Sequence, residues 1–124
     1  MKTLFVENNS SEQSLFEEQI RSFGYDVTVC PNAEAALEIY QQTFYPLIIV
    51  DLGLPGIDGL DFCRRIRVLL QGDRSMILVM TGRDEGKSLQ AALDAGADDY
   101  LTKPVSMEML QVRLTILEQQ FLLQ

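Results

Sequence analysis

Five side chains that could do chemistry together follow four short apolar segments of this 124-residue chain. They supply two carboxylates, a carboxamide, a hydroxyl and an amine: Glu7, Asn8, Asp51, Thr81 and Lys103. If the apolar segments are parallel strands, their carboxyl ends meet at one edge of a sheet and bring these groups together. Two carboxylates about 4 Å apart repel by about 4 kcal/mol at an effective dielectric near 20. The pattern therefore favours a bound cation at this edge.

A divalent cation with oxygen ligands would relieve that repulsion and leave Lys103 to balance a further anion. A phosphoryl group fits this second role, with Asp51 as the candidate nucleophile that forms an acyl phosphate. Magnesium and Lys103 would neutralise the phosphoryl oxygens, while Thr81 would donate a hydrogen bond to one of them. These residues thus predict a site for phosphoryl transfer assisted by Mg²⁺.

The apolar pattern predicts the elements that must position these residues. Short apolar runs, predicted as strands, lie at 3–6, 25–30, 46–50, 76–80 and 98–101. Amphipathic stretches between them, predicted as helices, lie at 11–23, 32–40, 60–70, 84–95 and 105–123. The central runs are apolar throughout, which is typical of parallel strands covered on both faces. Right-handed crossovers then give a doubly wound α/β domain of five strands and five helices.

Composition excludes several classes of function. The chain has no histidine, and Cys30 and Cys63 alone cannot complete a zinc site. A net charge of −8 repels DNA phosphates, so direct nucleic-acid binding is not expected. Neither a signal peptide nor a membrane-spanning run is evident, and the two cysteines are predicted to be reduced core residues. These features predict a cytoplasmic location without membrane attachment.

Three motifs in order carry a resemblance to a known family. They are Ile49-Val50-Asp51-Leu52-Gly53-Leu54-Pro55-Gly56-Ile57-Asp58-Gly59, Met80-Thr81-Gly82 and Ala95-Gly96-Ala97-Asp98-Asp99-Tyr100-Leu101-Thr102-Lys103-Pro104. With them the chain resembles the receiver domain of response regulators, the phospho-acceptor module of bacterial two-component signalling. The resemblance covers residues 1–124 as one receiver domain. It implies a flavodoxin-like (CheY-like) (βα)5 fold with strand order 2-1-3-4-5.

The resemblance also implies roles for individual residues. Asp51 would receive a phosphoryl group from a histidine kinase or histidine phosphotransfer protein, so the missing histidine lies on the partner. The domain would be a regulatory phospho-acceptor that assists its own phosphorylation and dephosphorylation, rather than an enzyme. Phosphorylation would alter the surface of the fourth helix, fifth strand and fifth helix. The implied Mg²⁺ ligands are Glu7, Asn8, Asp51 and the backbone carbonyl of Gly53. The implied switch pair is Thr81 and Tyr100, and the implied structural residues are Pro55, Gly59 and Pro104, with a cis Lys103–Pro104 bond.

The sequence departs from the family pattern in two places. The first strand of the family usually ends in two acidic residues, whereas Glu7 is followed here by Asn8, which predicts weaker Mg²⁺ binding and slower phosphorylation. A homodimer is expected through the face of the last two helices and last strand, or through the C-terminal helix. Asp98, Asp99 and Arg113 fit the charge-paired dimer of one subfamily of transcription-factor receivers. Leu89 and Met109 stand where that subfamily has charged partners, which argues against its pairing.

Other interpretations of the same residues stay open. The chain could be a pseudo-receiver that binds proteins without phosphorylation, or a flavodoxin-like flavin binder, although no glycine lies in the loop after Glu7. Thr81 could be a helix N-cap, and Tyr100 could simply pack in its strand. Arg64, Arg65 and Arg67 are interpreted as a solvated basic helix face. Both a stand-alone regulator and a piece of a longer protein are compatible with this length.

Overall fold

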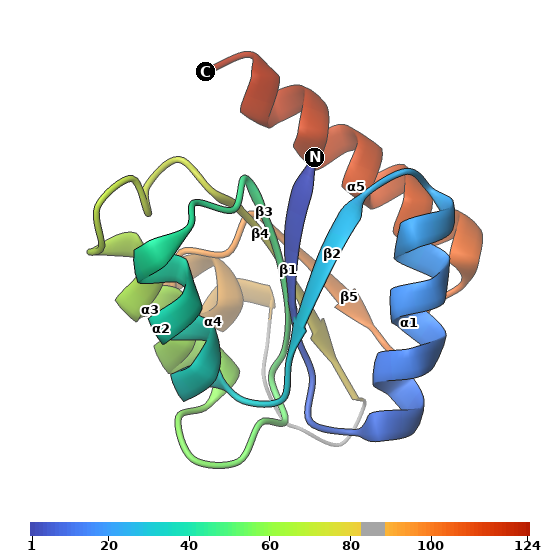
Figure 1. Cartoon of the computed structure of the whole chain (residues 1–124), viewed down its shortest axis with the longest axis horizontal. Helices are drawn as coiled ribbons and strands as arrows, with labels where there is room; N and C mark the ends of the chain where they lie inside the picture. The colour runs from blue at the N-terminus through green and yellow to red at the C-terminus, as the bar shows by residue number, and fades with distance from the viewer. Residues whose placement is uncertain (83–88) are drawn as a thin grey trace.

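A five-stranded parallel sheet forms the centre of the computed structural model, which describes residues 1–82 and 89–124 (Figure 1). The strands are β1 (Lys2–Val6), β2 (Asp26–Cys30), β3 (Leu47–Asp51), β4 (Met76–Thr81) and β5 (Asp99–Thr102). Their order in the sheet is β2-β1-β3-β4-β5. This confirms both the doubly wound fold and the strand order that the resemblance implies.

Helices cover both faces of the sheet, with α2, α3 and α4 on one face and α1 and α5 on the other (Figure 1). Their bounds are α1 (Ser10–Ser22), α2 (Ala33–Gln42), α3 (Gly59–Arg67), α4 (Leu89–Asp94) and α5 (Met107–Leu122). Residues 84–88 of the predicted fourth helix lie outside the described residues. Among the helices that the structure describes, none is long and apolar enough to cross a membrane.

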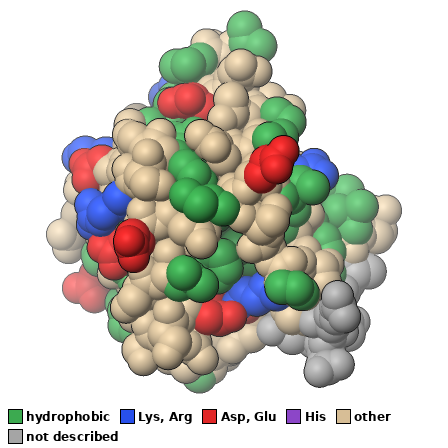
Figure 2. Space-filling view, turned by 90° about the vertical axis from the view of Figure 1, so that its right-hand side faces the viewer, with side chains coloured by type: hydrophobic (Ala, Val, Ile, Leu, Met, Phe, Trp, Pro, Cys, Tyr) green, Lys and Arg blue, Asp and Glu red, His purple; other side chains and the backbone are tan. Residues whose placement is uncertain are grey.

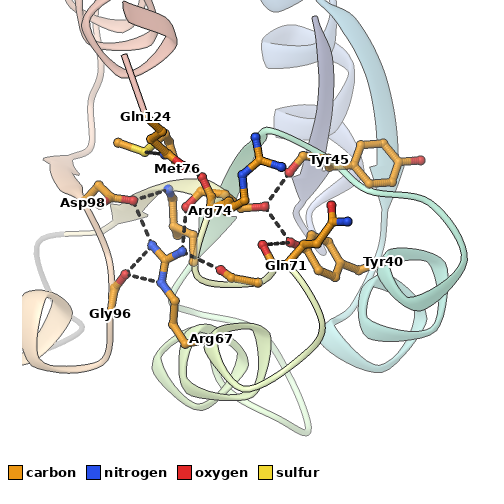
Figure 3. A network of polar contacts seen from close by, with 12 residues as sticks. Tyr40, Tyr45, Arg67, Gln71, Arg74, Met76, Gly96, Asp98 and Gln124 are labelled. Atoms are coloured by element: carbon orange, nitrogen blue, oxygen red, sulfur yellow. Dashed lines mark hydrogen bonds and ion pairs between the residues drawn. The ribbon is translucent and has the colours of Figure 1, made fainter. Parts of the chain in front are cut away.

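Helix α3 ends three residues before the predicted end at Leu70. After Arg67 the chain turns back against the helix, with hydrogen bonds from Leu69 N to Ile66 O and from Gly72 N to Leu69 O. The guanidinium of Arg67 binds the carbonyls of Gly72 and Ser75 beyond this turn (Figure 3). The apolar run after Arg67 therefore continues into a turn, which leaves two of its side chains, Val68 and Leu70, exposed.

Two apolar layers hold the sheet, because side chains of a strand alternate between its faces. On β3, Ile48 and Val50 point toward α2, α3 and α4, while Leu47 and Ile49 point toward α1 and α5. Both β3 and β4 are buried along their full lengths, as their unbroken apolar sequences predict. The carboxyl ends of β3 and β4 therefore emerge from strands that are buried on both faces.

The two cysteines are free thiols buried in the layer beneath α2, α3 and α4. Burial raises the pKa of both, to about 12 for Cys63, so each thiol is protonated as well as shielded near neutral pH. We expect a chromogenic disulfide reagent at about pH 8 to label neither cysteine in the folded protein and both in concentrated guanidinium chloride. Rapid labelling of the folded protein would contradict this placement.

Candidate functional site

Side chains from the carboxyl ends of three strands meet at one edge of the sheet, the lower edge in Figure 1. Glu7 follows β1, Asp51 ends β3, and Lys103 follows β5. The Lys103 Nζ atom lies 3.0 Å from Glu7 Oε1 and 2.5 Å from Asp51 Oδ2. Three residues predicted from the ends of apolar runs are thus in direct contact, although up to 96 positions separate them in the sequence.

A third carboxylate, Glu12, joins this cluster from the first turn of α1. Its Oε2 atom lies 2.8 Å from Lys103 Nζ, and one oxygen from each of Glu7, Glu12 and Asp51 lies within 4.8 Å of the others. Glu12 was not predicted from the sequence, because it lies in a helix rather than at the end of a strand. The available signal was an acidic residue three positions after the helix N-cap Asn9, where a glutamate commonly folds back toward the cap.

Asp51 is held by two donors and is almost completely buried. Its Oδ1 atom accepts a hydrogen bond of 2.8 Å from the Gly53 backbone N–H, and its Oδ2 atom accepts from Lys103 Nζ. Burial alone would raise the pKa of this carboxyl, but the hydrogen bonds from Lys103 and Gly53 outweigh burial and lower it. Asp51 is therefore ionised at neutral pH, as a carboxylate nucleophile must be.

The pKa values of Glu7 and Lys103 are both raised in the folded protein. The pKa of Glu7 is raised to about 7, first by burial and then by the neighbouring Asp51, while Lys103 opposes both. For Lys103, burial favours the neutral amine, but hydrogen bonds to Asp51, Glu12 and Glu7 outweigh it and raise its pKa. The lysine therefore stays charged, while Glu7 is poised to release a proton when a cation arrives.

Other predicted site residues lie around this cluster. Asn8 is exposed, and its backbone N–H donates to Glu7 Oε2 at 3.0 Å, while Asn9 caps α1. Thr81 is buried at the end of β4, where its hydroxyl contacts the Gly82 carbonyl at 3.2 Å. Tyr100 lies on β5, half-buried against the layer beneath α2, α3 and α4. Thr81 and Tyr100 thus occupy adjacent strands.

The predicted structural residues shape the loops that carry Asp51 and Lys103. The Lys103–Pro104 peptide bond is cis. At Gly59, the first residue of α3, a Cβ atom would lie 2.8 Å from the Asp51 carbonyl oxygen, so any larger residue would collide with the backbone. Asp58 caps the helix by accepting a hydrogen bond from Asp61 N. The Asp58-Gly59 pair, in the same loop as Pro55, thereby allows α3 to start directly against the end of β3.

The acidic residues of the predicted interaction face have partners within this chain. Asp98 Oδ2 accepts hydrogen bonds of 2.8 Å from Arg67 Nη2 and from the Ile77 backbone N–H. Asp99 Oδ2 lies 3.3 Å from Arg113 Nη1. Two apolar residues of the same prediction, Leu89 and Met109, are exposed. A homodimer through this face stays a prediction.

The family model of the response regulator receiver domain matches residues 3–115. The chain belongs to this family. It is 38% identical over 117 residues to the two-component response regulator PhoP of Pseudomonas aeruginosa, which covers 94% of this chain and 51% of that protein. It is 35% identical over 113 residues to the response regulator ArlR of Staphylococcus saprophyticus, covering 91% of this chain and 50% of that protein. The receiver domain thus spans about half the length of these curated relatives.

Solved structures of receiver domains share its fold. A putative response regulator from Chloroflexus aurantiacus is 30% identical, with a TM-score of 0.88 over 94% of this chain and 95% of that one. The receiver domain of the sensor histidine kinase PA1611 from P. aeruginosa is 32% identical, with a TM-score of 0.84 over 97% and 96% of the two chains. That structure has a magnesium ion coordinated in the active site cleft.

Receiver domains bind Mg²⁺, and the donors gathered here suit that ion. Magnesium prefers hard oxygen ligands and usually keeps several of its waters, so a few carboxylates suffice to hold it. The described part of this receiver domain offers such oxygens from Glu7, Glu12 and Asp51. Because these carboxylate oxygens lie within 4.8 Å of one another, one ion can contact more than one of them.

Proposed function

We propose that this receiver domain accepts a phosphoryl group on Asp51 from a histidine kinase or a histidine phosphotransfer protein. The observation that carries the proposal is the contact of 2.5 Å between Asp51 Oδ2 and Lys103 Nζ at the buried end of β3. The Asp51 carboxylate is buried, and its hydrogen bond with Lys103 lowers its pKa and so keeps it ionised. A nucleophile and a cation for the transferred group are therefore already side by side.

The transfer needs only positioning and charge compensation. An oxygen of Asp51 attacks the phosphorus of the partner's phosphohistidine, a P–O bond forms, and the P–N bond breaks. The imidazole nitrogen leaves with the electron pair of that bond. Lys103 moves its contact from the carboxylate to a phosphoryl oxygen, and the Thr81 hydroxyl donates to another. A Mg²⁺ ion held by Glu7, Asn8, Asp51 and the Gly53 carbonyl would neutralise part of the remaining negative charge. The same groups are proposed to support dephosphorylation by water.

Asp51→Asn tests this proposal directly. Acetyl phosphate with Mg²⁺ should add one phosphoryl group to the wild-type protein, as measured by intact mass, and none to the variant, because a carboxamide is a far poorer nucleophile. Asp26→Asn is the matched control, since Asp26 is exposed at the opposite end of the sheet and should leave the uptake unchanged. Uptake by Asp51→Asn would place the reacting group elsewhere.

The pseudo-receiver is the second candidate function, and the neutral Asn8 at the end of β1 is the observation that favours it. In that case the folded wild-type protein would take up no phosphoryl group from acetyl phosphate at any Mg²⁺ concentration. A flavin binder fits poorly, because its cofactor phosphate would meet the carboxylates of Glu7 and Asp51.

The proposed output of phosphorylation is a change in the surface of α4, β5 and α5. Thr81 would move toward the phosphoryl group, and the Tyr100 ring would follow, so that the bound group favours one of two arrangements. Figure 2, which shows the side of the molecule with α1 and α5, has several hydrophobic side chains at the surface. Exposed apolar residues of α5 include Met109, Val112 and Ile116. We propose this helix as part of the contact with a partner or a second copy in the cytoplasm.

A further inference from the structure

Glu12 reaches the strand-end cluster because the first turn of α1 is fixed to the end of β1. The Asn9 side chain accepts a hydrogen bond of 3.0 Å from the Glu12 backbone N–H. One residue further, the Gln13 side-chain amide donates to the Glu7 backbone carbonyl. These two contacts set the rotation of the helix, and the Glu12 carboxylate consequently lies against Lys103 rather than over its own N-cap.

The charges at the cluster call for a cation besides Lys103. Three carboxylates face one ammonium group, and in their ionised form this leaves two negative charges for a divalent cation to neutralise. Without Glu12 only one negative charge would remain, because Asn8 is neutral. With Glu12 the site has three carboxylates. This is the number that Glu7, Asp51 and an acidic residue at position 8 would provide together.

Exposure distinguishes Glu12 from the other two carboxylates. Its side chain is 35% exposed, whereas those of Glu7 and Asp51 are 3% and 7% exposed. Glu12 therefore stands on the solvent side of the cluster, where a hydrated ion would enter. Magnesium keeps much of its water, so a ligand at the open side suits it.

We infer that Glu12 supplies the third carboxylate of the Mg²⁺ site and takes over the part of the acidic residue that Asn8 replaces. The inference rests on the metal site of the proposed function and does not depend on phosphoryl transfer to Asp51. It changes the expectation drawn from Asn8: binding is weaker than with an aspartate at position 8, but it is not limited to two carboxylates.

Titration calorimetry with MgCl₂ and no phosphodonor tests the inference. Glu12→Gln should weaken Mg²⁺ binding by about tenfold or more, since loss of a group that supports a metal site typically costs about 10- to 100-fold in affinity. Glu17→Gln is the control, because Glu17 lies further along the same helix and pairs with Arg21 at 2.9 Å. Glu17 contributes no oxygen to the group of carboxylates at the strand ends, so this control should bind Mg²⁺ like wild type.

Asn8→Asp completes the test. Alone it should tighten Mg²⁺ binding, and combined with Glu12→Gln it should return the affinity close to that of wild type. The rise of the unfolding temperature with Mg²⁺ gives a second readout and shows that each variant is folded. Equal affinities for Glu12→Gln and Glu17→Gln, or a wild-type protein that binds no Mg²⁺, would overturn the inference. If Glu12→Gln weakens Mg²⁺ binding while acetyl phosphate leaves Asp51 unmodified, the inference stands and the proposed phosphorylation fails.

Discussion

Arg67→Met is expected to lower the free energy of unfolding by about 3 to 5 kcal/mol, because it takes the guanidinium away from three carbonyl groups and from a carboxylate that keeps only the Ile77 backbone N–H. Arg67 stands between two loops and the start of β5 (Figure 3). Its Nη1 atom donates to the carbonyls of Gly72 and Ser75 at 2.7 and 2.6 Å. Its Nε and Nη2 atoms donate to the Gly96 carbonyl, and Nη2 also pairs with Asp98 at 2.8 Å. Methionine keeps most of the apolar stem and removes all five donor contacts.

Two other substitutions distinguish the loss of the Arg67 hydrogen bonds from the loss of a positive charge alone. Arg64→Met removes an exposed arginine of the same helix, whose side chain is 57% exposed compared with 19% for Arg67, and should cost less than about 1 kcal/mol. Arg67→Lys keeps the charge, but a single ammonium group cannot reproduce the planar fork, so most of the loss should remain. Urea denaturation with an unchanged m-value measures all three variants. Similar stabilities for Arg67→Met and Arg64→Met would show that the network contributes little.

The same substitution should spare the phosphoryl site. Arg67 contacts the start of β5 and the loop before β4, whereas Asp51 and Lys103 lie at the carboxyl ends of β3 and β5. At temperatures where Arg67→Met remains folded, acetyl phosphate should therefore still modify Asp51. Loss of this uptake in the folded variant would indicate coupling between the two ends of the sheet.

The sequence predicted most of the fold and three central residues of the site for a common physical reason. A short, β-branched apolar run such as 46–50 favours a strand covered on both faces, and whatever follows a parallel strand arrives at the same edge of the sheet. Glu7, Asp51 and Lys103 were therefore predictable from their places after such runs. Gly59 was indicated only by resemblance, because the backbone that approaches it comes from the end of another element.

Glu12 and Arg67 show where sequence patterns stop being informative. Each lies on a helix, and only the rotation and packing of that helix decide whether its side chain meets solvent or other groups. The interpretation of the basic cluster as a solvated face is correct for Arg64 and Arg65, which are exposed beside Asp61. It is wrong for Arg67, whose partners lie up to 31 residues away in the sequence. Contacts of that range leave no local pattern.

Lys103→Met is expected to destabilise the metal-free protein by about 3 to 5 kcal/mol at about pH 8, and by less at about pH 6. Lys103 is the ammonium group that all three carboxylates of the site contact. Removing it leaves carboxylates with oxygens within 4.8 Å of one another and without this counter-charge. Protonation relieves the repulsion, so the loss of stability must depend on pH.

The direction of that dependence follows from Glu7. Its pKa is about 7 in the folded protein against 4.5 for an ordinary glutamate, so between these values the folded state holds more protons than the unfolded state. Stability therefore falls as pH rises through this window, by at most about 1.4 kcal/mol per pH unit from this group, and levels off above it. Lys103 lowers the pKa of Glu7, so removing Lys103 raises that pKa. In Lys103→Met the stability therefore continues to fall above pH 7.

Urea denaturation at the two pH values, with and without Mg²⁺, measures the effect. Lys2→Met is the matched control, since Lys2 is exposed at the start of β1, and its stability should follow that of wild type. Mg²⁺ should recover part of the stability of Lys103→Met at the higher pH, because a divalent cation replaces the missing charge. An equal loss at both pH values would mean that the carboxylates titrate independently of Lys103. In that case the lysine would serve packing rather than charge balance, and Mg²⁺ would not restore what its removal costs.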